Sequence, residues 1–384
     1  IGETVSRLFI GNEIPHEGIS KIIRNSLIFP APITRLTESL GVLELFHGPS
    51  LAFKDFGARF MAQTMGWFVE QREDALHILV ATSGDTGGAV ADGFLNVPGI
   101  TVSILYPKGG VSDIQERQLT THGANITAYQ VDGTFDDCQR MVKEAFLDAD
   151  LQAKKSLSSA NSINIARLIP QTFYYFSALS SLYRMGIPRE EHITVSVPSG
   201  NLGNVTAGLI ARKMGAPIAH LIAATNRNDT FPRYLESGKF QPIRSQQTIS
   251  NAMDVGNPSN FERLHVLCDK EHGTLSQEIL GYTFDDETTR EEMRRCSKEH
   301  GYLIDPHGAI ALLAARHHLT ALQHESHFAI ALGTAHPIKF ESIVKEVCGV
   351  SPAMPLPLAE LLQRKKEFTS LRPTLIDLKE CLLS

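Results

Sequence analysis

The sequence has few cysteines and no cysteine pairs. Its 384 residues include five cysteines, which stand far apart and form no C-x-x-C pair. An odd number of scattered cysteines indicates neither a disulfide framework nor a zinc site, so we expect no metal. Free thiols suit a reducing compartment, and we therefore expect a cytoplasmic protein.

Strong charge and long apolar runs are lacking too. The formal net charge is −6, and no run of five like charges occurs. This composition argues against a nucleic-acid partner. No apolar run is long enough to span a bilayer, and no secretory signal opens the chain, so we expect no membrane partner. The chain begins at Ile1 rather than Met, and we expect residues to precede it.

Short β-rich runs alternate with amphipathic stretches along the chain. This alternation predicts a parallel sheet with helices on both faces, and ligands in such folds bind beyond the carboxyl ends of the strands. The residues after 350 are rich in Pro and Leu without a strand signal, and we expect a helical tail there. The expected strands are 76–81, 100–106, 125–131, 192–197, 218–224 and 328–332. The expected helices are 87–94, 112–122 with Ser112 as cap, 136–149, 165–185, 204–214, one that starts at Asp305-Pro306 and one that ends near 347.

Three glycine-containing loops follow expected strands, at 82–88 (TSGDTGG), 198–204 (PSGNLGN) and 333–337 (GTAHP). Glycine lets a backbone approach a ligand closely, and free N–H groups at a helix start favour an anion. The second loop is the best phosphate candidate, because Gly200 and Gly203 bracket two residues whose N–H groups can converge. Neither G-x-x-x-x-G-K-[ST] nor G-x-G-x-x-G is present. The alternative is a turn that serves packing alone.

The first loop is rich in hydroxyl groups. Thr82, Ser83 and Thr86 surround Asp85, which suits a carboxylate or a second phosphate. The alternative is a cap for the next helix, made by Asp85 or Thr86. Further along, Arg167 follows a run of amides and hydroxyls, and it is either a phosphate clamp or an ordinary surface arginine.

Lys54 occupies an unusual place in the apolar and aromatic run HGPSLAFKDFG at 47–57. Burial of an ammonium group is costly and lowers a lysine pKa, and such a lysine is a nucleophile that forms Schiff bases. The alternatives are a side chain that extends to the surface, or one that pairs with Asp55.

Three histidines lie beside the proposed loops, namely His47, His307 and His336. No H-E-x-x-H or comparable ligand spacing is present, so a metal site is not indicated. We expect these side chains to make hydrogen bonds within loops or at helix starts.

Taken together, these motifs resemble the threonine synthases, which are pyridoxal-phosphate enzymes of fold type II (tryptophan synthase β-like). The matching segments run in order from about residue 10 to about residue 345. They are HGPSLAFKDFGARF (47–60), ATSGDTGG (81–88), SANSINIARL (159–168), VPSGNLGN (197–204), ATNRND (224–229), NAMDVGNPSN (251–260), DDETT (285–289) and GTAHPIKF (333–340). The resemblance implies an α/β fold with a parallel-rich open sheet in a large domain, at 1–75 and 165–384 with its tail at 351–384. A smaller inserted α/β domain is expected at 76–164, and a longer N-terminal segment is expected before Ile1.

The resemblance also implies the roles of single residues. Lys54 carries pyridoxal 5′-phosphate as a Schiff base beside Phe53 and acts as the catalytic base. Asp85 matches the position that faces the 3′ oxygen of the cofactor, where related branches carry Asn, and Thr334 meets the pyridine nitrogen. The cofactor phosphate is expected on Gly200, Asn201, Leu202, Gly203 and Asn204. The phosphate and carboxylate of the substrate are expected on Ser83, Thr86, Asn161, Ser162 and Arg167.

The implied reaction converts O-phospho-L-homoserine and water into L-threonine and phosphate by γ-elimination and β-addition. This makes the chain a lyase of amino-acid biosynthesis with a small-molecule substrate, and we expect a monomer or weak dimer. One alternative is a serine or threonine dehydratase of the same fold, which shares Lys54 but needs no second phosphate site. A non-catalytic relative is another alternative, against which the intact Lys54 argues. A dinucleotide-dependent dehydrogenase is a more distant alternative, because the sequence lacks the G-x-G-x-x-G motif of such enzymes.

Overall fold

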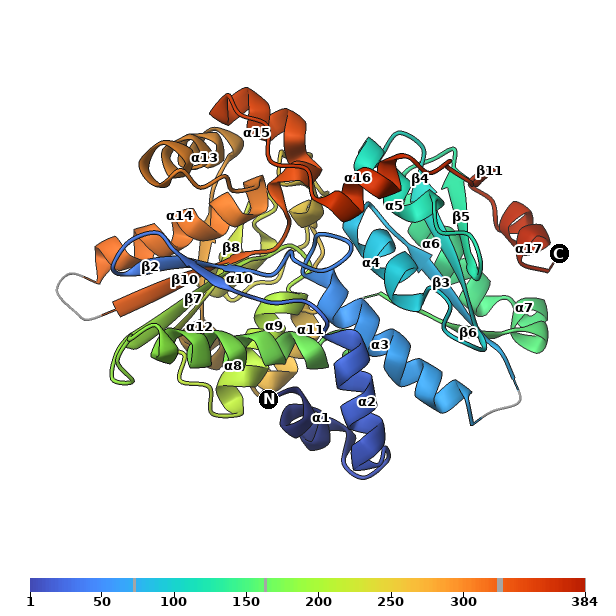
Figure 1. Cartoon of the computed structure of the whole chain (residues 1–384), viewed down its shortest axis with the longest axis horizontal. Helices are drawn as coiled ribbons and strands as arrows, with labels where there is room; N and C mark the ends of the chain where they lie inside the picture. Colours follow the sequence, from blue (N-terminus) through green and yellow to red (C-terminus); the bar gives the residue numbers. More distant parts are fainter. Residues whose placement is uncertain (72–73, 162–163, 323–326, 384) are drawn as a thin grey trace. The chain divides into compact units, whose positions relative to one another are not determined.

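The structure is a computed structural model that describes residues 1–71, 74–161, 164–322 and 327–383. These residues form two compact units, and each unit is built around one sheet. The first unit comprises Ile1–Phe9, Phe29–His47 and Leu168–Ala353, and the second comprises Ile10–Ile28, Gly48–Arg167 and Met354–Ser384. Figure 1 labels the helices and strands. No helix among the described residues has both the length and the apolar character to cross a membrane.

The sheet of the first unit has the strand order β1-β2-β10-β7-β8-β9. The pair β1 and β2 is antiparallel, and the other neighbouring pairs of the described sheet are parallel. The strands are β1 (Ile33–Arg35), β2 (Leu40–Glu44), β7 (His192–Pro198), β8 (His220–Thr225), β9 (Ile279–Thr283) and β10 (His327–Gly333). The helices are α1 (Gly2–Ile10), α8 (Ile169–Arg184), α9 (Gly203–Lys213), α10 (Thr230–Ser237), α11 (Phe261–Leu267), α12 (His272–Glu278), α13 (Asp286–His300), α14 (Pro306–Ala321) and α15 (Glu341–Cys348), with short 3-10 turns η2 (Asn251–Met253) and η3 (Pro337–Phe340).

Apolar residues of the first sheet pack against helices. Val42 of β2 and Ala331 of β10 lie in one buried cluster with residues of α13, α14 and α15. Ile222 of β8 lies in another cluster, with Met253 of η2 and Ile310 of α14. Because β7, β8 and β10 run parallel, their carboxyl ends meet at one edge of the sheet. The expected glycine loops at 198–204 and 333–337 therefore start from the same edge.

The sheet of the second unit has the order β11-β5-β4-β3-β6, and its described neighbouring strands are all parallel. The strands are β3 (Leu76–Ala81), β4 (Ile100–Pro107), β5 (Ile126–Val131), β6 (Ser156–Ser158) and β11 (Thr369–Leu371). The helices are α2 (His16–Ser26), α3 (Lys54–Val69), α4 (Asp85–Phe94), α5 (Asp113–Thr120), α6 (Phe135–Leu147), α7 (Ala149–Lys154), α16 (Leu356–Leu362) and α17 (Leu375–Leu383), with a 3-10 turn η1 (Ile165–Arg167).

Both faces of this second sheet are buried, as β3 shows. Ile78 and Val80 lie in a cluster with residues of α3 and α4. Leu79 and Ala81 point the other way, into a cluster with residues of α6 and α17. A strand that is covered on both faces needs apolar residues at successive positions. This explains the uninterrupted run LHILVA that predicted the strand.

The α/β class with parallel-rich sheets is confirmed, and so are the six expected strands, with their ends shifted by a few residues. The helix expected at 165–185 was wrong at its start. A 3-10 turn ends at Arg167, and α8 begins at Ile169 with Pro170 in its first turn. Proline lacks the N–H that a continuous helix would need there.

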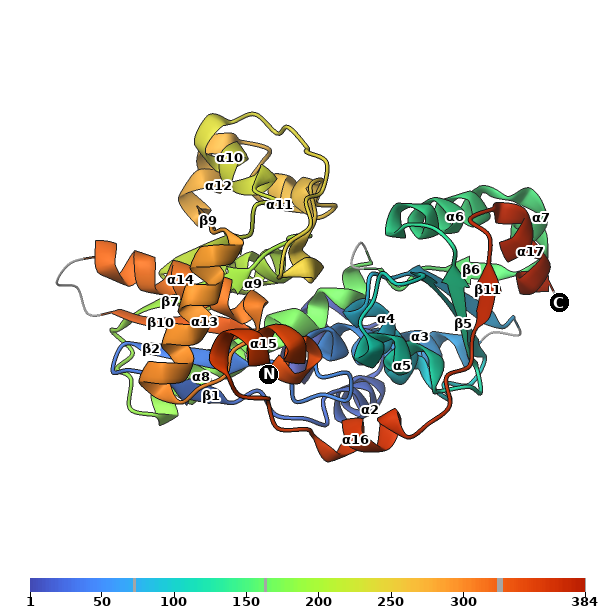
Figure 2. The same ribbon diagram turned by 90° about the horizontal axis from the view of Figure 1, so that it is seen from above.

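The prediction of a purely helical tail was also wrong. β11 interrupts the tail and pairs with β5, so that it forms an edge of the sheet, as Figure 2 shows beside α17. Three residues carry too little pattern for a strand prediction. The second unit contains the expected inserted segment 76–164 within Gly48–Arg167, and it also includes Ile10–Ile28 and Met354–Ser384. The domain boundaries expected from the sequence stay a prediction.

Candidate active site

The proposed phosphate cup (residues 200–204) follows β7 and leads into α9. Leu202 has a left-handed backbone, with φ of 60°, and is the N-cap of α9. Gly200 is equally constrained, because a Cβ atom there would lie 2.7 Å from Met253 Cα. The cup thus combines a tight turn with the free N–H groups of a helix start, and this combination suits an anion.

Two side chains of the cup are held by named partners. Asn201 Oδ1 accepts hydrogen bonds from the backbone N of Ser259 at 2.6 Å and from its Oγ at 2.9 Å. Asn204 Oδ1 accepts from the hydroxyls of Tyr174 at 2.6 Å and Tyr175 at 2.8 Å. Burial raises the pKa of both tyrosines well above its usual range, so both hydroxyls stay protonated and can donate.

The side-chain nitrogen of Asn204, Nδ2, differs from the oxygen in its contacts. Asn204 is 5% exposed, and its Nδ2 has no hydrogen-bond partner among the described residues. A buried donor without a partner is costly. An anionic oxygen bound at the start of α9 is a partner of the right chemistry, so the cup fits the phosphate of pyridoxal phosphate.

The turn η2, which packs on Gly200, is fixed by a histidine. His307 Nε2 accepts from the backbone N of Ala252 at 3.1 Å. His307 Nδ1 is bonded to Asp305 Oδ2 at 2.6 Å, and Asp305 is also the N-cap of α14. An Nε2 that accepts a hydrogen bond places the ring proton on Nδ1, towards the carboxylate.

The other two histidines also make local hydrogen bonds, as expected. His47 Nε2 lies 2.6 Å from Glu44 Oε2, and the His336 side chain accepts from the backbone N of Ile338 at the start of η3. The prediction of loop and capping hydrogen bonds is confirmed for His47, His307 and His336.

A buried polar network organises the segments around 226 and 254. Asn226 Nδ2 donates to Thr248 Oγ1 at 2.8 Å, Ser250 Oγ at 2.9 Å and Asp254 Oδ1 at 2.9 Å. Burial raises the pKa of Asp254, although hydrogen bonds that Thr248 and Asn226 donate to its carboxylate oppose the shift. Asn228 joins the same Asp254 oxygen at 3.2 Å. The motifs ATNRND and NAMDVGNPSN therefore build the loops of this region.

Sequence reasoning missed several of these supporting residues. Tyr174 and Tyr175 stand in an apolar stretch and read as core, yet their hydroxyls orient the cup. Ser259 lies far along the chain from the cup, and only the fold brings it there. Thr334, the residue expected at the pyridine nitrogen, directly follows β10 and is buried.

In the second unit, Lys54 is the first residue of α3. Its Nζ lies 4.0 Å from Asp85 Oδ2 and 5.9 Å from the centre of the Phe53 ring. The Lys54 side chain is half-buried, with 19% of its surface exposed. The sequence led us to expect an apolar surround. The structure adds a carboxylate, which stabilises positive charge on this nitrogen.

Asp85 begins α4, and its carboxylate has a second partner. Gln115 Nε2 donates to Asp85 Oδ1 at 3.0 Å, and both residues are buried. The preceding turn depends on Thr82, whose Oγ1 accepts from the backbone N of Gly84 and of Gly87. The alternative in which Asp85 or Thr86 caps this helix was wrong, because the N-cap is Gly84 and the side chain that accepts from the first turn is that of Thr82.

The residues expected to hold the substrate differ in exposure. Ser83 is exposed and Thr86 is half-buried, so both hydroxyls lie close to the surface of the loop. Asn161 is half-buried, and Ser162 lies outside the described residues. Their assignment stays a prediction.

Arg167 is not the surface arginine that one alternative required. It is 2% exposed, and its Nη1 donates to the carbonyl of Ala160 at 2.6 Å. Burial lowers its pKa to about 10, and the negative charge of Asp55 opposes that shift. A Cβ atom on Gly57 would lie 2.8 Å from Arg167 Nε, so the guanidinium packs directly on α3.

Two family models match the sequence. The first is described as pyridoxal-phosphate dependent enzyme and matches residues 25–333, and the second is described as threonine synthase, C-terminal, and matches residues 308–381. The first match covers well over half of the chain.

Relatives are similar over nearly the whole length. The chain is 46% identical to the threonine synthase of Escherichia coli (strain K12) over 355 residues, which is 92% of this chain and 80% of that protein. The crystal structure of threonine synthase from Escherichia coli matches with a TM-score of 0.89 at 41% identity, over 100% of this chain and 87% of that one. A PLP-bound threonine synthase from Brucella melitensis matches with a TM-score of 0.91 at 36% identity, over 99% and 87%.

The dehydratase alternative has only distant support. The structure of threonine deaminase isoform 2 from Solanum lycopersicum matches with a TM-score of 0.62 at 13% identity, over 88% of this chain and 89% of that one. Identity this low shows a shared fold alone. The matched family models and the identity to threonine synthases favour the threonine synthase family over the dehydratases. The chain therefore belongs to the threonine synthase family of pyridoxal-phosphate-dependent enzymes.

Proposed function

We propose that this chain converts O-phospho-L-homoserine and water into L-threonine and phosphate, as a carbon–oxygen lyase of threonine biosynthesis. The observation that carries the proposal is the half-buried amine of Lys54, which begins α3 and lies 4.0 Å from the Asp85 carboxylate. A lysine amine with a fixed charge partner is equipped to take and return protons.

The cofactor assignment rests on the phosphate cup. We assign the phosphate of pyridoxal 5′-phosphate to residues 200–204, because Asn204 Nδ2 is a buried donor without a described partner at the start of α9. Lys54 is assigned as the residue that binds the cofactor covalently, with Phe53 beside it. Thr334 would present a neutral hydroxyl to the ring nitrogen. Asp85 is assigned to the 3′ oxygen.

The residues of the chain perform the proton transfers. When bound, pyridoxal phosphate supplies an electron sink for the reacting carbons of the substrate. Lys54 Nζ removes the proton from the α carbon and returns protons after water has added. The Asp85 carboxylate stabilises the positive charge that Nζ carries between these transfers. The Phe53 ring, whose centre lies 5.9 Å from Nζ, limits the access of water to the amine.

The substrate assignment uses the hydroxyl-rich loop at 82–88. We assign Ser83, Thr86, Asn161, Ser162 and Arg167 to the phosphate and carboxylate groups of O-phospho-L-homoserine. The hydroxyls of Ser83 and Thr86 stand beside the first turn of α4, where N–H groups favour an anion. The assignment of Arg167 rests on its place in the family motif, because its described contacts lie inside the unit.

The test replaces Lys54 by alanine in the purified enzyme and measures phosphate release from O-phospho-L-homoserine. We expect the rate to fall by at least about 100-fold, because a positioned acid–base group contributes that much or more. The exposed Lys143, replaced in the same way, serves as the control. Borohydride reduction followed by peptide mapping should label Lys54. A wild-type rate in Lys54→Ala would contradict the proposal, and ammonia release from serine or threonine would favour the dehydratase.

The finer predictions on partners and location are also proposals. We infer a cytoplasmic enzyme that is a monomer or weak dimer and binds neither nucleic acid nor membranes. All five cysteines are free, which suits a reducing compartment, and the net charge of −6 does not favour nucleic acid. Sedimentation velocity of the purified enzyme measures its oligomeric state directly.

A further inference from the structure

Gln115 is a buried side chain with two separate hydrogen-bonding duties. It is the third residue of α5 and is 2% exposed. Its Oε1 accepts from the backbone N of Ser112 at 3.0 Å, which is one half of a capping box. Its Nε2 donates to Asp85 Oδ1 at 3.0 Å. The first duty serves the helix, whereas the second reaches the carboxylate beside Lys54.

The loop before Asp85 is shaped to admit this amide. Gly84 has φ of 140°, a conformation that side chains rarely adopt. A Cβ atom there would lie 2.5 Å from Gln115 Nε2 and 2.8 Å from Gln115 Oε1. Glycine at this position therefore leaves the space that the Gln115 amide occupies beside the Asp85 carboxylate.

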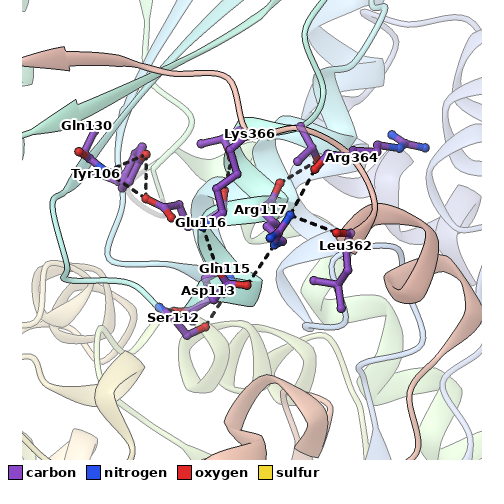
Figure 3. Close-up of polar contacts among 12 residues, drawn as sticks. Tyr106, Ser112, Asp113, Gln115, Glu116, Arg117, Gln130, Leu362, Arg364 and Lys366 are labelled. Atoms are coloured by element: carbon purple, nitrogen blue, oxygen red, sulfur yellow. Dashed lines mark hydrogen bonds and ion pairs between the residues drawn. The ribbon is translucent and has the colours of Figure 1, made fainter.

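The helix that carries Gln115 is held on its outer side by the C-terminal strap (residues 362–371). Lys366 Nζ bonds to Asp113 Oδ1 at 2.7 Å and also to Glu116 Oε2 (Figure 3). Glu116 Oε1 in turn accepts from Gln130 Nε2 at 3.0 Å and from the Tyr106 hydroxyl at 3.2 Å, which tie α5 to β5 and β4. Both carboxylates of the first turn are thus engaged by fixed partners.

The same strap contacts the next turn of α5. Arg117 Nη1 donates to the carbonyls of Leu362 at 3.1 Å and Arg364 at 3.2 Å (Figure 3). The backbone N of Glu367 donates to the carbonyl of Thr120 at 2.7 Å. α5 is therefore fastened on both sides, and a fastened element holds a reacting group more accurately than a loop does.

We propose that Gln115 is a positioning residue for the reaction, and that it turns the Asp85 carboxylate so that Oδ2 faces Lys54 Nζ. The inference rests on the proposed function, in which Lys54 is the base. Loss of the Gln115 donor removes one contact that orients the carboxylate, so the charge opposite Nζ is held less accurately. If Gln115 served only the capping box, a change of its amide group would leave Asp85 and Lys54 unaffected.

Two variants separate the two duties of Gln115. Gln115→Glu keeps oxygen atoms for the capping box, since Glu is favoured at this position, but loses the N–H donor. Its new carboxyl group faces Asp85, so the pair shares a proton at low pH and repels at high pH. Lys54 faces this pair from α3, and the Glu116 carboxylate on the same helix is held by Lys366. Gln115→Met removes both duties at every pH, and Ser112→Ala removes only the cap.

The experiment measures the absorbance of the bound cofactor and the rate of phosphate release against pH, in the holoenzyme. At about pH 5.5 the protonated carboxyl group of the Gln115→Glu variant donates to Asp85 in place of the amide, so we expect this variant to stay within about threefold of wild type. At about pH 8.5 we expect a loss of about 10- to 100-fold, because a hydrogen bond to a charged group is removed. The absorbance should change over the same pH range. Ser112→Ala should follow the wild-type profile throughout.

Three results would overturn the proposal. They are a wild-type pH profile in Gln115→Glu, the same altered profile in Ser112→Ala, or equal behaviour of the Gln115→Glu and Gln115→Met variants at about pH 5.5. The last comparison is decisive even where Gln115→Glu unfolds at high pH, because both variants are compared at one acidic pH. If the wild-type enzyme released no phosphate, the proposed function would fail, whereas the absorbance titration would still test Gln115.

Discussion

Replacing Gly200 by alanine tests whether the phosphate cup depends on its contact with η2. The added Cβ atom would lie 2.7 Å from Met253 Cα and 3.2 Å from the carbonyl oxygen of Ala252. Both neighbours are backbone atoms, so no change of rotamer relieves the overlap. Either the cup or η2 must move. An overpacked site of this kind costs about 1–3 kcal/mol.

That cost should appear in cofactor binding. The cup must return to its tight form to surround a phosphate, so about 1–3 kcal/mol corresponds to a loss of affinity of about 5- to 150-fold. Titration of the cofactor-free variant with pyridoxal phosphate, followed by absorbance, measures this loss. Urea unfolding of the same protein measures the part of the cost that falls on folding.

Gly273 offers a matched control within the same unit. A Cβ atom at this position of α12 meets nothing within 4 Å. Gly273→Ala should therefore bind the cofactor as wild type does and gain about 0.5–1 kcal/mol from helix propensity. If Gly200→Ala bound pyridoxal phosphate with wild-type affinity and showed no loss of stability, the rigid contact between cup and η2 would be refuted.

Three further changes have definite expected results. Gly57→Ala should destabilise the protein by about 1–3 kcal/mol in urea unfolding, because its Cβ would lie 2.8 Å from both the Nε and the backbone carbonyl oxygen of Arg167; an unchanged midpoint would show that the backbone at Arg167 can move away from α3. Tyr174→Phe should cost about 0.5–1.5 kcal/mol and weaken cofactor binding, and a neutral result would remove this hydroxyl from the support of the cup. Burial and histidine neighbours lower the pKa of His318 to about 4, so the unfolded chain binds its proton first and stability should fall as pH drops from about 6.5 to 4, by up to about 3 kcal/mol. His318→Gln should flatten that part of the stability profile, and an unchanged profile in this variant would contradict the assignment.

Much of the fold could be predicted because its signals are local. The apolar run of β3 indicates a strand, and the capping residues Ser112 and Asp305 indicate the helix starts of α5 and α14, each within a few residues. β11 could not be predicted in this way, since three residues become a strand only through pairing with β5. The turn before α8 precedes Pro170, which is a local signal for a helix start.

The residues of the candidate site also fall into two groups, those with a local sequence signal and those without one. The motif residues Lys54 and Asp85 were identified from the sequence, and the structure brings them within 4.0 Å of each other. The residues that orient the motifs were not, because Gln115 and the pair Tyr174–Tyr175 act through tertiary contacts. The sequence around such residues does not distinguish them from ordinary helix-capping residues or ordinary core residues.

The pairing of β11 with β5 has a consequence for the folding of the protein during translation. The second unit joins residues from near the start of the chain, from its middle and from 354 onwards, so its sheet gains an edge strand only after nearly all of the described chain has left the ribosome. Until then the edge of β5 and the apolar side chains that meet Leu378 and Leu382 are uncovered. Nascent chains that stall before residue 369 should therefore be the aggregation-prone species and the natural clients of chaperones.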